Sequence, residues 1–362
     1  MRRFLQAKAG VALFAALLFA AGCAKMDEQE ETPSFVPARI LSVYLPLMEK
    51  PDATRCLIAG SRAEAYREFF DRAGIAVDDL DAGDGKYDIV FLAGSTKTAL
   101  AELADFMGEK GVFARVVDIR GKTSALVKTE LEELSAQFPR AHLWMPALED
   151  WLVIGRKSPA KLKLDSMMEV FSREGGFDDL DAAQCQSLPE MFASYAGELE
   201  EAMPAFESLD AEAELRAQHL VTKDIPSIDW ISAADDIDAD ILERTSQEIR
   251  SMQVVRRVVL EGDILADAQD IDAATEAWAR AAMRNPRDPM LVDRLERLWK
   301  NADAFFRVGN FSLAAKCYET YLMIRPDDWQ SAEALSFCLA QLGKRELSAQ
   351  IHEKAMLMRD GK

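Results

Sequence analysis

Cysteine and histidine side chains can bind metal ions, and both can act as nucleophiles. The 362 residues include five cysteines and three histidines, His142, His219 and His352. The histidines lie far apart, and no cysteines have the close spacing of a zinc site. We therefore predict no metal site and no cofactor, and we assign no catalytic residue.

Four cysteines follow Cys23, namely Cys56, Cys185, Cys317 and Cys338. Cys317 and Cys338 lie in neighbouring predicted helices, and an oxidising compartment would allow a disulfide between them. Single cysteines on the apolar faces of helices are more often small core residues. Both interpretations stay open at this point.

The N-terminus has the order of a secretory signal peptide, which we assign to residues 1–22. Arg2 and Arg3 are basic, and residues 11–19 form an uncharged apolar segment too short to span a bilayer. Small residues follow, directly before Cys23. This arrangement resembles the lipobox of bacterial lipoproteins, although the usual leucine three residues before the cysteine is replaced by alanine. An ordinary cleaved signal peptide is the alternative.

The lipobox resemblance implies that Cys23 is acylated and anchors the chain to a membrane of the cell envelope. Two or three acyl chains, palmitate among them, would supply the hydrophobic signals that stable anchoring needs. Ala24 follows the cysteine. In the Gram-negative sorting rule that the resemblance implies, alanine there favours the outer membrane, with the folded part facing the periplasm. Residues 23–38 are acidic and contain proline, which predicts a flexible tether.

Alternating apolar and amphipathic segments between residues 39 and 159 predict an α/β domain with a mainly parallel sheet. We expect strands at residues 55–59, 87–92, 112–117, 142–144 and 151–154, and helices at residues 64–73, 98–107 and 124–137. Strands separated by helices need crossover connections, as in a parallel sheet. Residues 160–250 are acidic and predicted to be a helical connector.

The order of these segments resembles the spermidine synthase family, including its bacterial multidomain members, over residues 40–235. Residues 45–48 and 55–60 look like the lead-in to that family's nucleotide-binding strand, and residues 221–226 look like its C-terminal segment. Its later strands and turns are matched by residues 111–113, 138–139, 142–144 and 151–155. The resemblance implies a Rossmann-like, methyltransferase-type fold.

The complete glycine-rich turn, the ribose-binding acid and the catalytic aspartate of that family are missing from this chain. Gly60 is the glycine that survives in the glycine-rich turn, and the bulky, charged Arg62 follows it. The segment between Gly74 and Tyr87 is too short for the two βα units that lead to the ribose-binding acid. Residues 93–96 stand where the family has its catalytic aspartate. We therefore expect a degenerate domain without activity. An unrelated small α/β domain and an active exported transferase are the alternatives.

Residues 251–362 have the sequence pattern of tetratricopeptide repeats. In such repeats small residues let two helices approach, an aromatic residue fills the space between them, and a proline ends the second helix. Alignment on Pro286 and on Pro326 gives the matching residues Gly262, Ala274, Trp278 and Ala281, then Ala302, Ala314 and Tyr318. The prolines are 40 residues apart, so the connection should carry about six more residues than the usual repeat. A third unit, with Ser348 at the small position, is degraded like a capping pair. A plain bundle of helical hairpins is the alternative.

The first helix of each repeat should contribute to a concave face that binds a protein or peptide. The repeat pattern places these residues on that face: Arg256, Asp263, Trp299, Asp303, Phe306, Arg307, Glu333 and Phe337. Trp299 and Phe306 lie two helical turns apart. Exposed aromatic residues beside charges are typical of binding hot spots. The same two side chains would serve equally well as core residues.

The net charge of −19 argues against binding to nucleic acid. Such a surface favours solubility, or it matches a basic protein partner. We therefore expect a non-catalytic, lipid-anchored scaffold that binds a protein or peptide through its repeats and has no small-molecule substrate. An exported aminopropyl- or methyltransferase with accessory repeats is one alternative, and a purely structural envelope component is the other.

Overall fold

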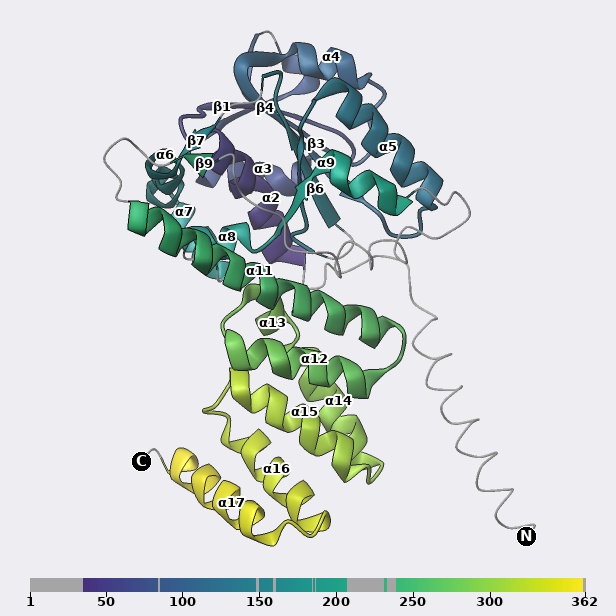
Figure 1. The fold of residues 1–362 in the computed structure, drawn as a ribbon, viewed down its shortest axis with the longest axis vertical. Coiled ribbons are helices and arrows are strands. Elements are labelled where there is room, and N and C mark those ends of the chain that lie inside the picture. Colours follow the sequence, from purple (N-terminus) through teal and green to yellow (C-terminus); the bar gives the residue numbers. More distant parts are fainter. Residues whose placement is uncertain are drawn as a thin grey trace, which may run out of the picture. The chain divides into compact units, whose positions relative to one another are not determined.

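A seven-stranded sheet organises the first part of the chain (Figure 1). The computed structural model describes residues 35–83, 85–147, 150–158, 161–183, 185, 187–206, 231–232 and 239–360. In chain order, the strands of the sheet are β1 (Arg55–Ala59), β2 (Ala76–Asp79), β3 (Tyr87–Ala93), β4 (Met107–Asp118), β5 (His142–Trp144), β6 (Asp150–Gly155) and β8 (Tyr195–Glu198). The strand order across the sheet is β2-β1-β3-β4-β6-β5-β8. The predicted α/β fold class is confirmed.

The sheet has a parallel half and an antiparallel half. β1 pairs in parallel with β2 and β3, and β3 pairs in parallel with β4. β6 pairs antiparallel with β4 and β5, and β8 pairs antiparallel with β5. The predicted crossover helices account for the parallel half, because parallel neighbours need long connections.

Both faces of the sheet are buried at β1 and β3, which explains why most residues of these two strands are apolar. Along β1, Cys56 and Ile58 face one core, whereas Leu57 and Ala59 face the other. Helices α2 (Phe35–Glu49) and α3 (Glu64–Arg72) belong to the first core. Helices α4 (Leu100–Asp105) and α5 (Ser124–Gln137) belong to the second.

Helix α2 begins inside the segment that the sequence predicts to be a tether. From Ile40 onward its apolar side chains are buried in the core. Pro46 lies within the helix. The C-terminal residue, Glu49, is buried and bonds to His142 (2.9 Å) and Arg156 (3.3 Å). The tether prediction for residues 23–34 lies outside the described residues.

The predicted helical connector also contributes to the sheet. Strand β8 continues the antiparallel half, so the α/β domain extends beyond residue 159. The other elements of this region are β7 (Leu162–Lys163), α6 (Leu164–Met168), a 3-10 turn η2 (Glu169–Ser172), α7 (Gly176–Ala182), α8 (Leu188–Phe192), α9 (Leu199–Ala202), a 3-10 turn η3 (Met203–Phe206) and β9 (Ile231–Ser232). Residues 221–226, which carry part of the family resemblance, lie outside the described residues.

Consecutive helices form a repeat-like region at the C-terminal end. They are α11 (Ala239–Asp267), α12 (Ile271–Arg284), α13 (Pro289–Asp293), α14 (Leu295–Arg307), α15 (Phe311–Ile324), α16 (Trp329–Gln341) and α17 (Arg345–Arg359). The helices pack in hairpins, α11 with α12, α14 with α15 and α16 with α17. Gln269, Gly309 and Gly343, one in each hairpin turn, adopt positive φ angles, as residues that end helices often do.

The small and aromatic positions of the first hairpin pack as the sequence pattern requires. A Cβ atom on Gly262 would lie 2.4 Å from Nε1 of Trp278, so glycine is what lets the indole ring reach this depth. The Trp278 side chain is fully buried, and its N–H donates to Val259 O and to Asp263 Oδ1, both at 3.3 Å. In the degraded third hairpin, hydrogen bonds between Ser336 and Ser348 join the two helices instead.

The six extra residues between the two prolines form a short helix. Residues 289–294 comprise α13 and the turn residue Arg294, after which α14 begins. Asp288 caps α13 by accepting from the backbone N–H groups of Met290 and Leu291.

Across the described residues, no helix is both long enough and apolar enough to span a bilayer.

Candidate functional site

Two turns follow β1 and β3 at the point where the strand order reverses. The sheet continues from β1 to β2 in one direction and from β3 to β4 in the other. Open α/β sheets bind their ligands at such a switch point, in the crevice outside the carboxyl ends of the strands. A nucleotide-like cosubstrate would have to enter between the turn at Gly60 and the turn at Gly94.

Hydrogen bonds join these two turns directly to each other. The N–H of Ser61 donates to Ser95 O at 2.9 Å, and the N–H of Arg62 donates to Ala93 O at 3.0 Å. The N–H of Ser95 donates back to Ser61 Oγ at 3.1 Å. Backbone donors that could face a phosphate are therefore used inside the protein.

The two glycines permit this close approach of the turns. Gly60 has a φ of +100°, and a Cβ atom there would lie 2.2 Å from Ala93 O. Gly94 has a φ of +80°, and its Cβ would lie 2.4 Å from Ser61 Oγ. Gly60 thus allows one backbone segment to approach another closely.

One acidic residue occupies a position that the sequence analysis described as missing. Strand β2 ends at Asp79, about 20 residues after Gly60, which is where dinucleotide-binding folds place their ribose-binding acid. The Asp79 carboxylate forms an ion pair with Arg67 of α3. The edge strand β2 was not predicted, so its terminal acid was not recognised.

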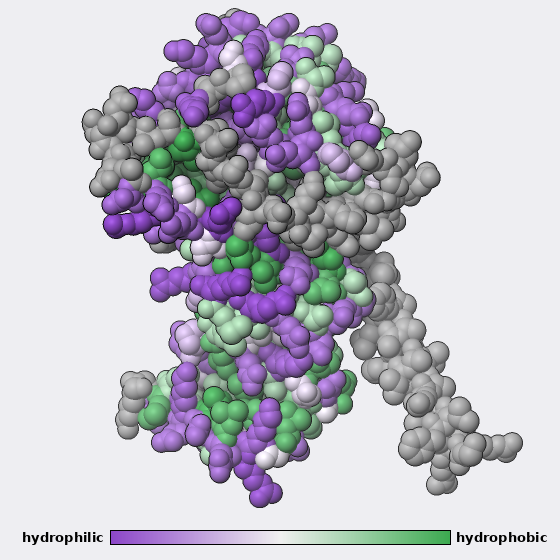
Figure 2. Space-filling view, in the orientation of Figure 1, coloured by the Kyte–Doolittle hydropathy of each residue, from purple (hydrophilic) through white to green (hydrophobic). Residues whose placement is uncertain are grey.

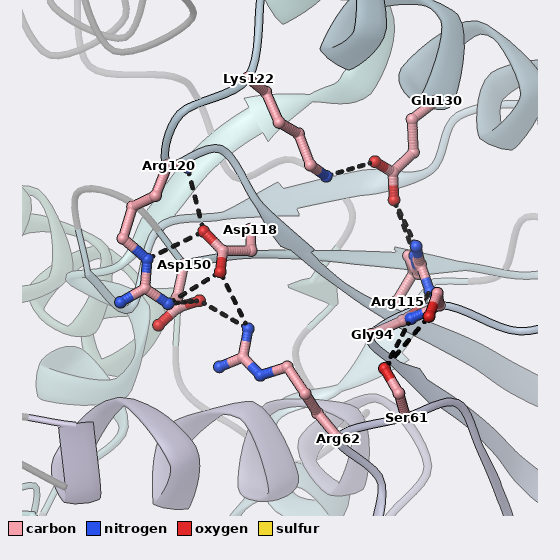
Figure 3. Close-up of polar contacts among 10 residues, drawn as sticks. Ser61, Arg62, Gly94, Arg115, Asp118, Arg120, Lys122, Glu130 and Asp150 are labelled. Atoms are coloured by element: carbon pink, nitrogen blue, oxygen red, sulfur yellow. Dashed lines mark hydrogen bonds and ion pairs between the residues drawn. The ribbon is translucent and has the colours of Figure 1, made fainter. Parts of the chain in front are cut away.

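A group of four charged side chains lies beside these turns, at the end of β4 and the start of β6 (Figure 3). We name Arg62, Asp118, Arg120 and Asp150 the edge cluster. Arg62 Nη1 lies 3.2 Å from Asp118 Oδ2 and 3.4 Å from Asp150 Oδ1. Arg120 Nη2 lies 2.8 Å and 3.4 Å from the same two carboxylates. The sheet register sets this geometry, because Asp118 at the end of β4 is paired with Asp150 at the start of β6.

The two carboxylates of the edge cluster differ in acidity. Burial raises the pKa of Asp150 above its ordinary value, despite the nearby Arg120 and Arg62. Burial acts in the same direction on Asp118, but hydrogen bonds from Arg120 outweigh it and lower the pKa of that carboxyl. Two guanidinium groups face two carboxyl groups, so the cluster satisfies its own charges without a ligand.

A second ion-pair group lies beside the Gly94 turn, as Figure 3 shows. Arg115 donates to Glu130 Oε1 at 2.6 and 2.8 Å and also to Gly94 O. Lys122 donates to Glu130 Oε2 at 3.0 Å. A hollow of about 360 Å³ adjoins Arg115 and Glu130, with Thr96 and other residues on its wall. Of the charged residues on its wall, Arg115 and Glu130 form an ion pair with each other, and Glu133 also lines it.

The charged groups described at this edge take part in ion pairs and hydrogen bonds with one another. Within the described residues, no group of three or more His, Cys, Asp or Glu side chains could hold a metal ion. Arg62 was predicted only as an obstacle to ligand approach, and the other three members of the edge cluster were not predicted. Charged residues at the ends of predicted strands, such as Asp118, were the signal that could have found them.

Six of the eight residues predicted for the repeat face lie on α14 and α16. Trp299 is 43% exposed and Phe337 is 48% exposed. Phe306 and Phe337 come together, with ring centroids 5.4 Å apart. Phe311 lies at the start of α15. Its ring centroid is 5.9 Å from that of Phe306 and 5.8 Å from that of Phe337. We name Phe306, Phe311 and Phe337 the aromatic cluster. Phe311 was not predicted as part of the face.

Charged groups also lie on α14 and α16, the helices that carry Phe306 and Phe337. Asp303 and Arg307 pair with each other at 2.8 Å, four residues apart on α14. Glu333 is exposed on α16. No like-charged patch results from this arrangement, since the paired side chains neutralise each other.

Arg256 and Asp263 do not lie on an exposed face. Arg256 is 1% exposed, with its Nε 3.4 Å from Asp288 Oδ2. Asp263 is 4% exposed and accepts from both Nε and Nη2 of Arg294 at 2.6 Å. Their partners stand just before α13 and just after it, so the extra segment between the repeats is what covers these two positions.

Cys23 lies outside the described residues, so its predicted acylation stays a prediction. The four cysteines in the described part of the chain are free and buried. Cys317 and Cys338 therefore form no disulfide, and the Cys317 thiol lies 3.6 Å from Thr275 Oγ1. They serve as small core residues in the repeat-like region.

No family model and no curated protein matches this chain.

Proposed function

We propose that this chain is a non-catalytic lipoprotein that is anchored through Cys23 and binds a protein partner on its tetratricopeptide repeats. In this proposal the α/β domain is a degenerate relative of the spermidine synthases. The protein would be tethered to a membrane of the cell envelope, with the outer membrane and its periplasmic face as the expected place. No small-molecule substrate takes part in this function.

The observation that carries the proposal is the exposed aromatic surface on the repeat-like helices. Phe337 and Trp299 keep nearly half of their side-chain surface in contact with solvent. Figure 2 shows apolar side chains gathered over the surface of this helical region. Exposed aromatic patches beside polar residues are typical of sites that bind other proteins.

Packing inside the hairpins supports the assignment to tetratricopeptide repeats. Gly262 and Trp278 are in close contact, as the repeat pattern requires of its small and aromatic positions. Ala274, Ala281 and Ala314 are fully buried. A plain helical bundle would not need small residues at these spacings.

The closed switch point supports the non-catalytic part of the proposal. The turns at Gly60 and Gly94 bond to each other, and the edge cluster neutralises its own charges. A transferase would need these donors and this space for its cosubstrate. Asp79 stands where a ribose-binding acid would, but its carboxylate forms an ion pair with Arg67.

The test uses a photo-cross-linking amino acid at the exposed position Glu333 of the full chain, expressed in its own cell envelope. We expect a defined protein adduct after irradiation. Combining Trp299→Ala with Phe337→Ala should abolish this adduct, because interface energy concentrates in exposed aromatic anchors. Both side chains are about half exposed, so the melting temperature should change little compared with truncation of a buried aromatic residue.

The control is a pair of apolar residues elsewhere that are more exposed than Trp299 and Phe337. Leu126 on α5 is 62% exposed and Phe177 on α7 is 64% exposed. Leu126→Ala with Phe177→Ala should leave the adduct unchanged. An adduct that persists after loss of Trp299 and Phe337, or that disappears equally in the control, contradicts the proposed binding surface.

A further inference from the structure

A second cavity lies near the start of β4 and the end of β6, at the opposite ends of these strands from the edge cluster. It has a volume of about 580 Å³, and its walls come from the end of α2, the start of β4 and residues within 156–158 and 161–169, which include β7 and α6. The register of β4 and β6 separates the two sites. Asp118 pairs with Asp150 at one end, whereas Phe113 pairs with Gly155 at the other, next to this cavity.

Basic side chains are unusually frequent around this cavity for such an acidic chain. They are Lys50, Lys110, Arg156, Lys161 and Lys163. Four acidic residues also line it, namely Glu49, Asp52, Glu109 and Glu169. The wall is therefore slightly positive, whereas the whole chain carries a net charge of −19.

Internal ion pairs use only part of this charge. Glu49 is committed to His142 and Arg156, and Asp52 is paired with Lys50. The remaining lysines, Lys110, Lys161 and Lys163, are exposed and form no ion pair with the residues that the structure describes. The ammonium groups of these three lysines can thus turn toward one ligand. Among the acids that line the cavity, Glu109 and Glu169 are the two outside these ion pairs, and they would repel an anion.

Arg156 adds an unsatisfied hydrogen-bond donor to the cavity wall. Its side chain is 13% exposed, and its Nε donates to Glu49 Oε2. Its Nη2 is buried and has no hydrogen-bond partner in the described part of the chain. Buried donors of this kind are rare in folded proteins, and a bound ion or water is a common explanation.

We propose that this cavity binds a phosphate group, either of a free phosphate compound or of an anionic lipid headgroup. The volume is in the range of small-molecule sites. Lysine ammonium groups bind phosphate as point charges and adapt to ligands of different shape. This site is independent of the repeat face, so it adds a ligand to the proposed function and does not depend on it.

The experiment measures binding to the full chain carrying Cys23→Ser, so that an acyl anchor cannot contribute. Calorimetry with inorganic phosphate and pyrophosphate tests free phosphates. Flotation with phosphatidylcholine vesicles, with and without phosphatidylglycerol, tests headgroups. Binding in either arm supports the site, and the arm that responds identifies the source of the phosphate. Failure of both arms overturns it.

Charge variants decide whether any binding occurs in this cavity. Lys161→Gln with Lys163→Gln should weaken binding about tenfold and reduce its dependence on salt. Neutralising the opposing acids, Glu109→Gln with Glu169→Gln, should strengthen it. All four side chains are exposed, so the fold should persist. The control, Lys97→Gln with Lys344→Gln, removes the same charge from exposed positions elsewhere. Equal weakening by the control would show that binding follows net charge, and the proposed site would then be wrong.

Discussion

Substituting Gly262 by alanine tests whether the first hairpin depends on close approach of a helix backbone to an indole ring. The added Cβ would lie 2.4 Å from Nε1 and 2.5 Å from Cδ1 of Trp278. The indole cannot retreat freely, because it is fully buried and its N–H donates to Val259 O and Asp263 Oδ1. Gly262→Ala should therefore destabilise the protein, although alanine is the better helix former.

The expected size follows from three opposing effects. Overpacking of a tight core costs about 1–3 kcal/mol. Displacement of the Trp278 N–H from its acceptors costs about another 1 kcal/mol. Replacing glycine by alanine inside a helix stabilises the folded state by about 1 kcal/mol. The net change in the free energy of unfolding should be a loss of about 1–3 kcal/mol.

In a chain that also lacks the indole ring, Gly262→Ala should have the opposite effect on stability. In a chain carrying Trp278→Leu the space beside residue 262 is open, so Gly262→Ala should stabilise that chain by up to about 1 kcal/mol. Urea unfolding followed by circular dichroism, with all four chains of the cycle, gives the coupling energy. If Gly262→Ala has the same effect in both backgrounds, or if it stabilises the chain that retains Trp278, the packing argument is refuted.

Three further predictions concern the anchor, the switch point and the buried acid. Metabolic labelling with a clickable palmitate should mark the natural chain and not Cys23→Ser; label retained by the variant would place the anchor elsewhere. Calorimetry of the full chain with S-adenosylmethionine and its decarboxylated form should show no binding up to about 1 mM, a limit of about −4 kcal/mol, because Arg62 and the joined turns close the crevice; a micromolar dissociation constant would contradict this. Burial alone would raise the pKa of Glu49, but His142 and Arg156 outweigh it and lower that pKa. The carboxylate therefore stabilises the fold above its unfolded pKa of about 4.3 and loses this effect as the pH falls through the folded value. Glu49→Gln should make the melting temperature less sensitive to pH between about 5 and 3, and an unchanged slope would show that other acids dominate.

The elements that the sequence predicts well are those whose local pattern agrees with their burial. Helix α5 and strand β5 have the predicted bounds, because an amphipathic run and a short apolar run are each flanked by turn residues. Strand β2 was missed because its sequence ends in two aspartates and it lies half exposed at the sheet edge. Strand β8 owes its conformation to pairing with β5, which is far away in the sequence. Local patterns carry no information on that partner.

The site depends still more on contacts between distant residues. Arg62 reaches Asp118 and Asp150, which lie 56 and 88 residues further along the chain. The sheet register that brings these carboxyl groups together cannot be read from the neighbours of any one of them. The same limit applies to Arg256 and Asp263. Their positions in the repeat pattern indicated an open face, but the side chains that pair with them stand at the two ends of an additional helix.

Helix α11 links the unfolding of the two halves of the protein. It spans 29 residues, or about 43 Å, and runs through the predicted boundary at residue 250. Ile249 belongs to one core of the sheet, and Val259 belongs to the core that includes Trp278 and the sheet residue Trp151. Loss of either half would expose the apolar side of this helix, so both halves should melt in one cooperative transition. A partner bound to the repeats would then raise the melting temperature of the sheet as well, because it stabilises the folded state of the whole unit.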